Sequence, residues 1–291
     1  MVVESALIPV GGSGSRLRSD LPRELPKLLY PIAGVPILAY PLLSLLRAPL
    51  KLVVLVTSSY THGAVSDLVE LLLRMLERSV ARVCIVKANA PGTARAVMAA
   101  RRLVNGPFLY TNGDVIYDPT LVSRLMSRFP QSDCSALVTG SARNRAPTHP
   151  HFIVGCDRRL AKVELYPEIS ARALCSLETA VLQPDLFEYL SALPDGAMTM
   201  AAVGKAVMSG YGVKVMRYSR FWYHLAEPRD LLISPKDRAA IRSIQQSLRL
   251  PLHWDLNSVQ AASSTGMTDT NLQSLARQSI KSRPDPTRPQ C

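Results

Sequence analysis

A glycine-rich stretch near the beginning of the chain carries the residues best suited to chemistry. It reads Gly11-Gly12-Ser13-Gly14-Ser15-Arg16, follows the apolar run 6–10, and is followed ten residues later by Pro26-Lys27. Glycines let backbone N–H groups approach phosphate oxygens closely, arginine offers a two-pronged donor, and lysine adds a compact charge. The stretch therefore predicts a polyphosphate-binding loop at the end of a first strand.

The spacing of this loop differs from that of two well-known phosphate-binding motifs. A Walker phosphate loop is excluded, because no Gly-Lys-Ser/Thr follows at the required spacing. The dinucleotide fingerprint fits poorly, because Leu17 stands where its third glycine would be expected. A plain tight turn stays open as an alternative. Arg16 and Lys27 on one early loop nevertheless favour a nucleoside triphosphate.

A second candidate site follows the apolar run 108–111. This run ends in Asn112-Gly113-Asp114, which puts a carboxylate at the carboxyl end of a strand, where open α/β sheets bind ligands. Mg²⁺ prefers one or two carboxylates together with phosphate oxygens and water. A plain Asx turn is the alternative, because Asn-Gly is a strong turn former. Two phosphate-type features on successive strand ends favour a Mg²⁺-assisted triphosphate site.

The composition limits the classes of partner. The chain has 291 residues and a formal net charge of +12. Such a charge suits nucleic acid or an anionic membrane surface, but Lys and Arg are scattered, without a dense basic run or interleaved aromatic residues. We therefore predict no nucleic-acid partner, and we attribute part of the charge to a phosphate-rich substrate.

Cysteine usage and the apolar segments bear on location. The five cysteines are far apart and include no Cys-x-x-Cys pair, which argues against a disulfide framework and a zinc site. Glu4 and Pro9 interrupt the first residues, so we expect no signal peptide. The apolar stretch 36–56 is broken by prolines and charged residues, so we expect no membrane span. The sequence predicts a cytoplasmic protein.

The elements that must position these residues alternate regularly in the first half of the chain. Strands are predicted at 6–10, 52–57, 82–86 and 108–111, and helices at 35–46, 65–78, 93–103 and 121–129. This alternation is typical of an α/β protein with a largely parallel sheet and helices on both faces. Its strand ends meet at one edge, so we expect the glycine loop and Asp114 to lie together there.

The second half reads differently. Short strands are predicted at 135–139, 152–156, 161–165, 175–182 and 212–217, the last extended by 221–225, and helices at 186–193 and 200–208. Ser234-Pro235 is typical of a helix start, which predicts a helix over 236–250. The remaining residues are rich in Ser, Thr, Gln and Pro, a composition that favours disorder. We therefore expect a main domain at 1–233, a helical extension at 234–259 and a disordered tail at 260–291.

In this order and spacing, the motifs resemble those of the sugar-phosphate nucleotidyltransferases. That family includes the mannose-1-phosphate guanylyltransferases and the glucose-1-phosphate uridylyl- and thymidylyltransferases. Residues 26–38 resemble its Pro-Lys segment, and Gly92-Thr93-Ala94 resembles its Gly-Thr-Ala turn. The resemblance is specific over residues 5–120 and looser up to 232. It implies a Rossmann-like, mostly parallel mixed sheet flanked by helices, of the GT-A-like type.

The resemblance also implies a role for each residue. Arg16 would hold the β- and γ-phosphates, Lys27 would lie between the α-phosphate and an acceptor phosphate, and Asp114 would bind Mg²⁺. An acceptor oxygen would attack the α-phosphorus in line and expel pyrophosphate, which needs positioning and charge neutralisation rather than an enzyme nucleophile. The nucleotide site would comprise Gly11, Gly12, Ser13, Gly14, Ser15, Arg16, Gly92, Thr93, Asn112 and Gly113.

The acceptor half departs from the family pattern. Where the family has Tyr-Gly, Glu-Lys-Pro and Gly-Ile-Tyr, this chain has Phe152-Ile153, Glu164-Leu165-Tyr166-Pro167 and Glu178-Thr179-Ala180, so the lysine that would meet the sugar phosphate is missing. The family's second metal carboxylate follows a Trp, and here that segment is Trp222-Tyr223-His224. Imidazole nitrogen suits Mn²⁺, Co²⁺ or Zn²⁺ better than Mg²⁺. His224 is therefore a second candidate ligand, with a packed or surface histidine as the alternative.

The sequence favours a metal-dependent nucleotidyltransferase that joins a nucleoside triphosphate to a phosphorylated sugar or related acceptor. The metal would be Mg²⁺, with Mn²⁺ or another divalent ion as an alternative. A non-catalytic relative that binds nucleotide or sugar nucleotide as a regulatory subunit is the second hypothesis, because of His224 and the missing lysine. No motif fixes the base or the acceptor, and a homo-oligomer stays open.

Overall fold

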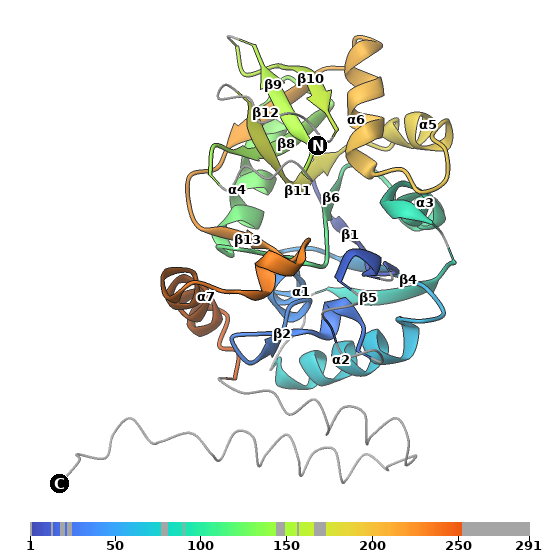
Figure 1. The fold of residues 1–291 in the computed structure, drawn as a ribbon. Coiled ribbons are helices and arrows are strands. Elements are labelled where there is room, and N and C mark those ends of the chain that lie inside the picture. The colour runs from blue at the N-terminus through green and yellow to red at the C-terminus, as the bar shows by residue number, and fades with distance from the viewer. Residues whose placement is uncertain are drawn as a thin grey trace, which may run out of the picture.

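A nine-stranded mixed sheet with helices on both faces forms the centre of the molecule (Figure 1). The computed structural model describes residues 2–12, 14–17, 21, 25–76, 81–89, 91–143, 149–155, 157–165 and 173–251. The predicted fold class, a Rossmann-like, mostly parallel mixed sheet flanked by helices, is confirmed.

The parallel half of the sheet comes from the first half of the chain. Strand β1 (Ser5–Pro9) pairs in parallel with β4 (Leu52–Thr57) and β6 (Phe108–Thr111), and β4 pairs in parallel with β5 (Arg82–Lys87). Along β1 the side chains alternate between the two faces, and both faces are buried. The four strands predicted in this half are therefore present, with the carboxyl ends of β1 and β6 side by side.

The antiparallel half comes from the second half of the chain and is centred on β11 (Leu174–Leu182). This strand runs antiparallel to β6, to β8 (Ala136–Ser141) and to β9 (His151–Val154). Strand β10 (Leu160–Glu164) pairs antiparallel with β9, and β12 (Val213–Arg217) pairs in parallel with β8. Because β11 adjoins β6, it carries residues from the second half of the chain to the edge where β1 and β6 end.

The helices divide the core into two hydrophobic clusters, one on each face of the sheet. One face is covered by α1 (Ala39–Leu46), α2 (His62–Met75), α4 (Thr120–Arg128) and α7 (Pro235–Ser247). The other is covered by α3 (Gly92–Ala99), α5 (Leu186–Ser191) and α6 (Thr199–Met208). Short 3₁₀ turns lie at Ser15–Leu17, Lys27–Leu29, Arg101–Leu103, Phe129–Gln131 and Pro228–Leu231.

The helix predicted at 35–46 is shorter than expected. A small hairpin of β2 (Pro31–Ile32) and β3 (Val35–Pro36) precedes it, and α1 begins only at Ala39. The turn residues Ala33 and Gly34 have φ of 52° and 85°, which is the twist that a two-residue hairpin needs. Val35 also precedes a proline, which disfavours helical backbone.

The strand predicted at 221–225 does not extend β12. Instead β13 (Trp222–His224) pairs antiparallel with β7 (Val115–Tyr117), in a separate two-stranded ribbon. In this register His224 lies opposite Val115, the residue after Asp114. The correction is important for function, because this ribbon carries His224 to the end of β6.

The carboxyl-terminal helix is present where the Ser-Pro signal predicts it. Helix α7 begins at Pro235, and the Ser234 side chain accepts a hydrogen bond from the backbone N–H of Asp237. The tail predicted at 260–291 lies outside the described residues, and the division into three parts stays a prediction. Within the described ranges, no helix combines the length and hydrophobicity that crossing a membrane requires.

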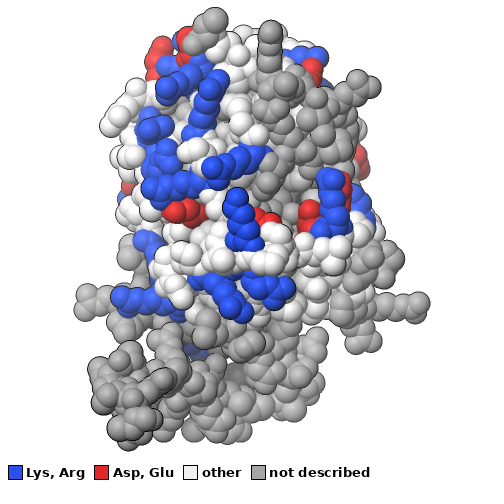
Figure 2. Space-filling model, turned by 60° about the vertical axis from the view of Figure 1, so that its left-hand side comes forward, with Lys and Arg blue, Asp and Glu red and all other residues white. Residues whose placement is uncertain are grey.

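Basic side chains are frequent on the face of the molecule that Figure 2 shows. On the face shown in Figure 2, Lys and Arg are interspersed with neutral residues and with some Asp and Glu. Several arginines pair with carboxylates, such as Arg159 with Asp157 and Arg220 with Asp118, each at 2.8 Å. The absence of a nucleic-acid partner stays a prediction.

Candidate active site

A pocket of about 500 Å³ opens beside the carboxyl ends of β1 and β6. It is lined by the glycine loop, by the beginning of α3, by the end of β6 and by single residues of β11 and β13. Of the residues predicted from the sequence, it brings together Gly11, Gly12, Gly14, Ser15, Arg16, Lys27, Gly92, Thr93, Asn112, Asp114 and His224. Ser13 lies outside the described residues.

The glycine loop passes close to Lys27. Gly14 has φ of +64°, and a Cβ built on it would lie 2.9 Å from the Cβ of Lys27. Its carbonyl accepts a hydrogen bond from the backbone N–H of Leu17 at 2.8 Å, which starts the short 3₁₀ turn that carries Arg16. Glycine at this position therefore permits both the turn and the approach of Lys27.

Arg16 is exposed at the wall of the pocket. Among the described residues, no carboxylate lies within ion-pair distance of its guanidinium. Burial raises the pKa of Glu178 inside the pocket, and the positive charge of Arg16 is one of several that oppose this rise. An arginine in this position can meet an anionic ligand without first breaking an internal pair.

Gly113 has a packing role. A Cβ at this position would lie 2.9 Å from a methyl carbon of Val10 and 3.1 Å from one of Leu38. The glycine therefore lets the end of β6 pack closely on the glycine loop and α1. Gly113 does not line the pocket, unlike its neighbours Asn112 and Asp114, so its predicted contact with a nucleotide stays a prediction.

The Gly-Thr-Ala turn is attached to the segment that precedes α6. Gly92 has φ of +80°, and a Cβ there would lie 2.5 Å from the carbonyl oxygen of Ala197. That carbonyl accepts a hydrogen bond from the backbone N–H of Ala94 at 3.1 Å, and the Thr93 hydroxyl accepts one from the backbone N–H of Thr199 at 2.9 Å. The turn is thus held rigidly while Gly92 and Thr93 face the pocket.

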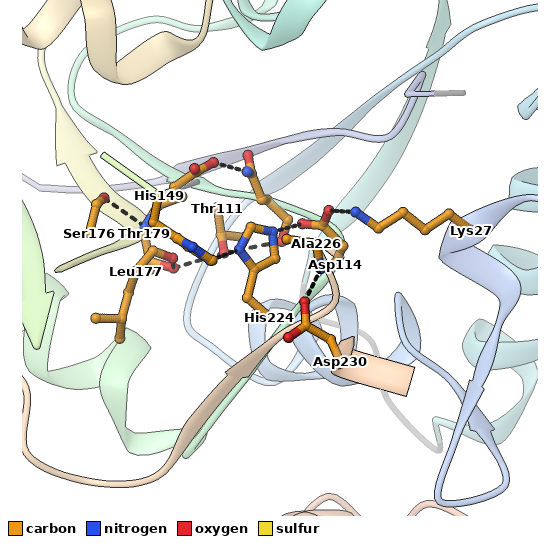
Figure 3. A network of polar contacts seen from close by, with 12 residues as sticks. Lys27, Thr111, Asp114, His149, Ser176, Leu177, Thr179, His224, Ala226 and Asp230 are labelled. Carbon is orange, nitrogen blue, oxygen red and sulfur yellow. Dashed lines mark hydrogen bonds and ion pairs between the residues drawn. The ribbon is translucent and has the colours of Figure 1, made fainter. Parts of the chain in front are cut away.

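Asp114 is contacted from two sides (Figure 3). Nζ of Lys27 lies 2.5 Å from Oδ2, and Nε2 of His224 lies 3.1 Å from Oδ1. Burial raises the pKa of Asp114, but the charge of Lys27, followed by that of His224 and by their hydrogen bonds, lowers this pKa far more. The carboxylate is therefore held ionised at the centre of the pocket.

The Asp114–His224 pair has the geometry of two metal ligands. Oδ1 of Asp114 is buried and faces Nε2 of His224 at 3.1 Å. Two neighbouring ligands of an octahedral ion with bonds of about 2.1 Å lie about 3.0 Å apart. The described residues contain no cluster of three or more His, Cys, Asp or Glu around a metal position. These two side chains fit an ion that takes its other ligands from phosphates and water.

His149 lies behind His224. Nε2 of His149 and Nδ1 of His224 share a hydrogen bond, and the two rings meet edge to face with centroids 4.5 Å apart (Figure 3). Burial, followed by the charge of His224, lowers the pKa of His149 to about 2. A neutral His149 can accept the Nδ1–H of His224, and a neutral His224 held in this way would present the Nε2 lone pair to an ion bound beside Asp114.

The segment after β13 is fixed to the end of β6. The backbone N–H of Leu225 donates to the carbonyl of Asp114 at 3.0 Å. Oδ2 of Asp230 accepts a hydrogen bond from the backbone N–H of Ala226 at 2.8 Å (Figure 3). It also accepts one from the backbone N–H of Glu227 at 2.7 Å. These bonds hold the chain beside Asp114 and fix the position of His224.

Glu178 reaches the pocket from β11. It is only 5% exposed, and its carboxylate accepts a hydrogen bond from the side-chain amide of Asn112, whose Oδ1 accepts the Tyr110 hydroxyl at 2.5 Å. Burial raises the pKa of Glu178. Glu164, in the segment that resembles Glu-Lys-Pro, pairs instead with Lys162 at 2.9 Å and does not line the pocket.

A glycine loop and a buried carboxylate at the strand ends of a mixed α/β sheet are typical of nucleotide-binding enzymes. The nucleotidyl transferase family model matches residues 5–151, about half of the chain. The protein therefore belongs to the nucleotidyl transferase family, and the resemblance to sugar-phosphate nucleotidyltransferases is confirmed.

Individual relatives agree with this assignment. The bifunctional protein GlmU of Methanococcus aeolicus is 23% identical over 230 residues, covering 78% of this chain and 52% of that protein. GlmU of Thermus thermophilus is 35% identical over 138 residues, covering 46% of this chain and 27% of that protein. The chain thus spans about half or less of the length of these relatives.

Solved structures show the same fold. The inositol-1-phosphate CTP transferase of T. maritima superposes with a TM-score of 0.70 at 20% identity, covering 84% of this chain and 98% of that one. A putative glucose-1-phosphate thymidylyltransferase of Bacillus anthracis gives a TM-score of 0.69 at 16% identity, covering 82% and 95%. Nearly the whole length of each corresponds to this chain.

Proposed function

We propose that this protein is a metal-dependent nucleotidyltransferase that joins a nucleoside triphosphate to a phosphorylated sugar or polyol and releases pyrophosphate. The observation that carries the proposal is the convergence of the glycine loop, Arg16, Lys27, Asp114 and His224 on one pocket. Family membership favours catalysis over the binding-only alternative. A cytoplasmic location stays a prediction from cysteine usage.

The donor side follows from the loop and its cations. Backbone N–H groups of the glycine loop and the exposed Arg16 would hold the β- and γ-phosphates, and Lys27, next to Asp114, would contact the α-phosphate. An acceptor phosphate oxygen forms the new bond to the α-phosphorus while the bond to the β-phosphate oxygen breaks. The electron pair leaves with pyrophosphate, whose charge Arg16 neutralises.

The metal would be held by Asp114 and His224. When bound, a divalent ion supplies charge neutralisation at the phosphate oxygens. We infer Mg²⁺ or, because one ligand is an imidazole nitrogen, Mn²⁺. His149 would fix the His224 ring so that Nε2 faces the ion, as partners behind metal-bound histidines do.

The acceptor is inferred only as a class. Structural relatives are described as acting on inositol 1-phosphate and glucose 1-phosphate, both monophosphates of hydroxyl-rich bodies. We propose the same class here, although the family's lysine for the sugar phosphate is missing from the segment 164–167. Lys27 is then the cation available to both reacting phosphates.

The test is pyrophosphate release from a matrix of nucleoside triphosphates and monophosphate acceptors, each with Mg²⁺ and Mn²⁺. We expect turnover with at least one pair, and a loss of about 100-fold or more in Asp114→Asn, because the neutral amide cannot serve the metal or Lys27. Asp133→Asn is the matched control, because that side chain is 98% exposed. Triphosphate binding without pyrophosphate release from any pair would favour the binding-only alternative.

A further inference from the structure

Glu178 has a backbone conformation that is unusual for its residue type. Its φ is +51°, in the left-handed region that glycine adopts freely and long side chains avoid. It lies in β11 where the register against β8 shifts between Ser176 and Ala180. A strained glutamate on the pocket wall, where glycine would be relaxed, indicates that its side chain has a use.

The irregularity in β11 turns this side chain toward the pocket and fixes it there. The backbone N–H of Glu178 donates to the Ser176 hydroxyl at 3.0 Å, and its carbonyl accepts the backbone N–H of Asn112 at 3.2 Å. The side-chain amide of Asn112 donates to Oε2 of the carboxylate. Both the backbone and the carboxylate are therefore held by Asn112, which follows β6 and leads to Asp114.

The orienting hydrogen bonds continue behind Asn112. Its Oδ1 accepts the buried Tyr110 hydroxyl, so the amide is turned with its donor toward Glu178. Among the described residues, Asn112 is the only hydrogen-bond donor to this carboxylate, and it uses Oε2. The other oxygen, Oε1, therefore stays available to a ligand in a preorganised position.

The chemistry of the surroundings limits what this ligand can be. Glu178 shares the pocket with Arg16, Lys27 and His224, which suit the phosphates, but it is itself an acceptor of hydrogen bonds. A buried carboxylate repels a second phosphate or carboxylate on the acceptor and favours hydroxyl donors. It therefore suits the neutral, hydroxylated body of a monophosphate.

We propose that Glu178 is a specificity-determining residue that accepts a hydrogen bond from a hydroxyl group of the phosphorylated acceptor. This inference rests on the proposed function, because it assigns the acceptor side of the same pocket. It predicts that the protein selects acceptors by a particular hydroxyl group. It also predicts that Glu178 does not affect the binding of the donor triphosphate.

The test uses the full chain with Glu178→Gln, which keeps the size and loses the charge. The matched control is Glu188→Gln, an exposed change on α5 outside the pocket. The probes are glucose 1-phosphate, inositol 1-phosphate, their single-deoxy analogues and phosphocholine. Acceptor binding is measured by calorimetry without triphosphate, so that no turnover can take place. The KM values for acceptor and triphosphate are then measured separately.

We expect Glu178→Gln to weaken binding of the preferred hydroxylated acceptor by about 10-fold or more. The KM for triphosphate should change by less than about 2-fold. The deoxy analogue that lacks the contacted hydroxyl should bind equally to the wild-type protein and to Glu178→Gln. The hydrogen bond is already absent from that analogue, so removing the charge of Glu178 has no further effect. If Glu178→Gln does not fold, Glu178→Asn, which tolerates left-handed backbone, should give the same loss.

Several results would overturn the proposal. The first is that, for every deoxy analogue, the loss of binding from the missing hydroxyl adds to the loss from Glu178→Gln. The second is that the substitution leaves acceptor binding unchanged. The third is that the protein binds phosphocholine in preference to both polyol phosphates. Failure of the proposed function looks different, because the wild-type protein would then release no pyrophosphate from any pair. The binding measurements would still decide the role of Glu178 in that case.

Discussion

At the scale of single residues, the function depends on what His224 does beside Asp114. Its Nε2 lies 3.1 Å from Oδ1 of Asp114, and its Nδ1 is bonded to His149. We predict that His224→Asp shifts the metal preference of the protein toward Mg²⁺, because a second carboxylate replaces a nitrogen ligand. Mn²⁺ binding followed by electron paramagnetic resonance, with pyrophosphate release in each metal, measures the shift.

His149→Phe is the companion variant for this prediction. It keeps an aromatic ring in the buried space against Trp222 but removes the nitrogen that holds His224. Mn²⁺ affinity should fall by about 10-fold while the order of metal preference stays the same, because partners behind metal ligands affect affinity on this scale. If neither variant changes Mn²⁺ binding, His224 is a packed histidine and the metal assignment is wrong.

The residues of the site differ in how well the sequence could predict them. Arg16, Lys27 and Asp114 lie in short motifs whose spacing is visible along the chain, and the pocket contains all three. His149 could not be found in this way, because its partner is 75 positions away and the pairing depends on β13 joining β7. Glu178 was not singled out from the sequence, because its place in the pocket depends on its unusual φ and on the pairing of β11 with β6.

At the scale of elements, Gly92 shows how one backbone position holds two segments together. A Cβ there would lie 2.5 Å from backbone atoms of residues 196 and 197, and φ is +80°. We predict that Gly92→Ala lowers the free energy of unfolding by about 2 kcal/mol or more and weakens triphosphate binding, because the turn must move away from the loop before α6. Urea unfolding measures the first effect.

Gly63→Ala is the matched control for Gly92→Ala. Gly63 lies in the first turn of α2, and a Cβ built on it would meet nothing within 4 Å. Alanine there should raise the free energy of unfolding by about 0.5–1 kcal/mol, because it favours helix and restricts the unfolded chain. Equal effects of the two substitutions would contradict the assigned role of Gly92.

Elements were predicted well where the pattern is local and less well where pairing is distant. The strands expected at 52–57 and 108–111 have those bounds, because continuous apolar β-branched or aromatic runs identify buried strands. The hairpin before α1 was missed, because Ala33 adopts a turn conformation that its residue type does not signal. The ribbon of β7 and β13 was missed because it joins segments about a hundred residues apart.

At the scale of the whole molecule, the alternation of strands and helices was enough to predict the fold class. It indicated a parallel half with two buried faces, and therefore the edge at which Gly12 and Asp114 meet. The antiparallel half could not be arranged from its short strands, because their order depends on which edges are free. The second half of the chain supplies Glu178 on β11 and His224 on β13 to the pocket.

The whole molecule should also report the donor through its stability. A triphosphate at about a hundred times its Kd stabilises the folded state by about 2.7 kcal/mol, or about 5 °C or more in Tm for a chain of this size. We predict that Arg16→Ala removes most of the shift given by the triphosphate and little of that given by the monophosphate, because Arg16 is assigned to the β- and γ-phosphates. Arg102→Ala, an exposed change outside the pocket, is the control. Equal losses for the two nucleotides would assign Arg16 to the α-phosphate or to the fold, and the direction of the triphosphate in the pocket would then have to be reversed.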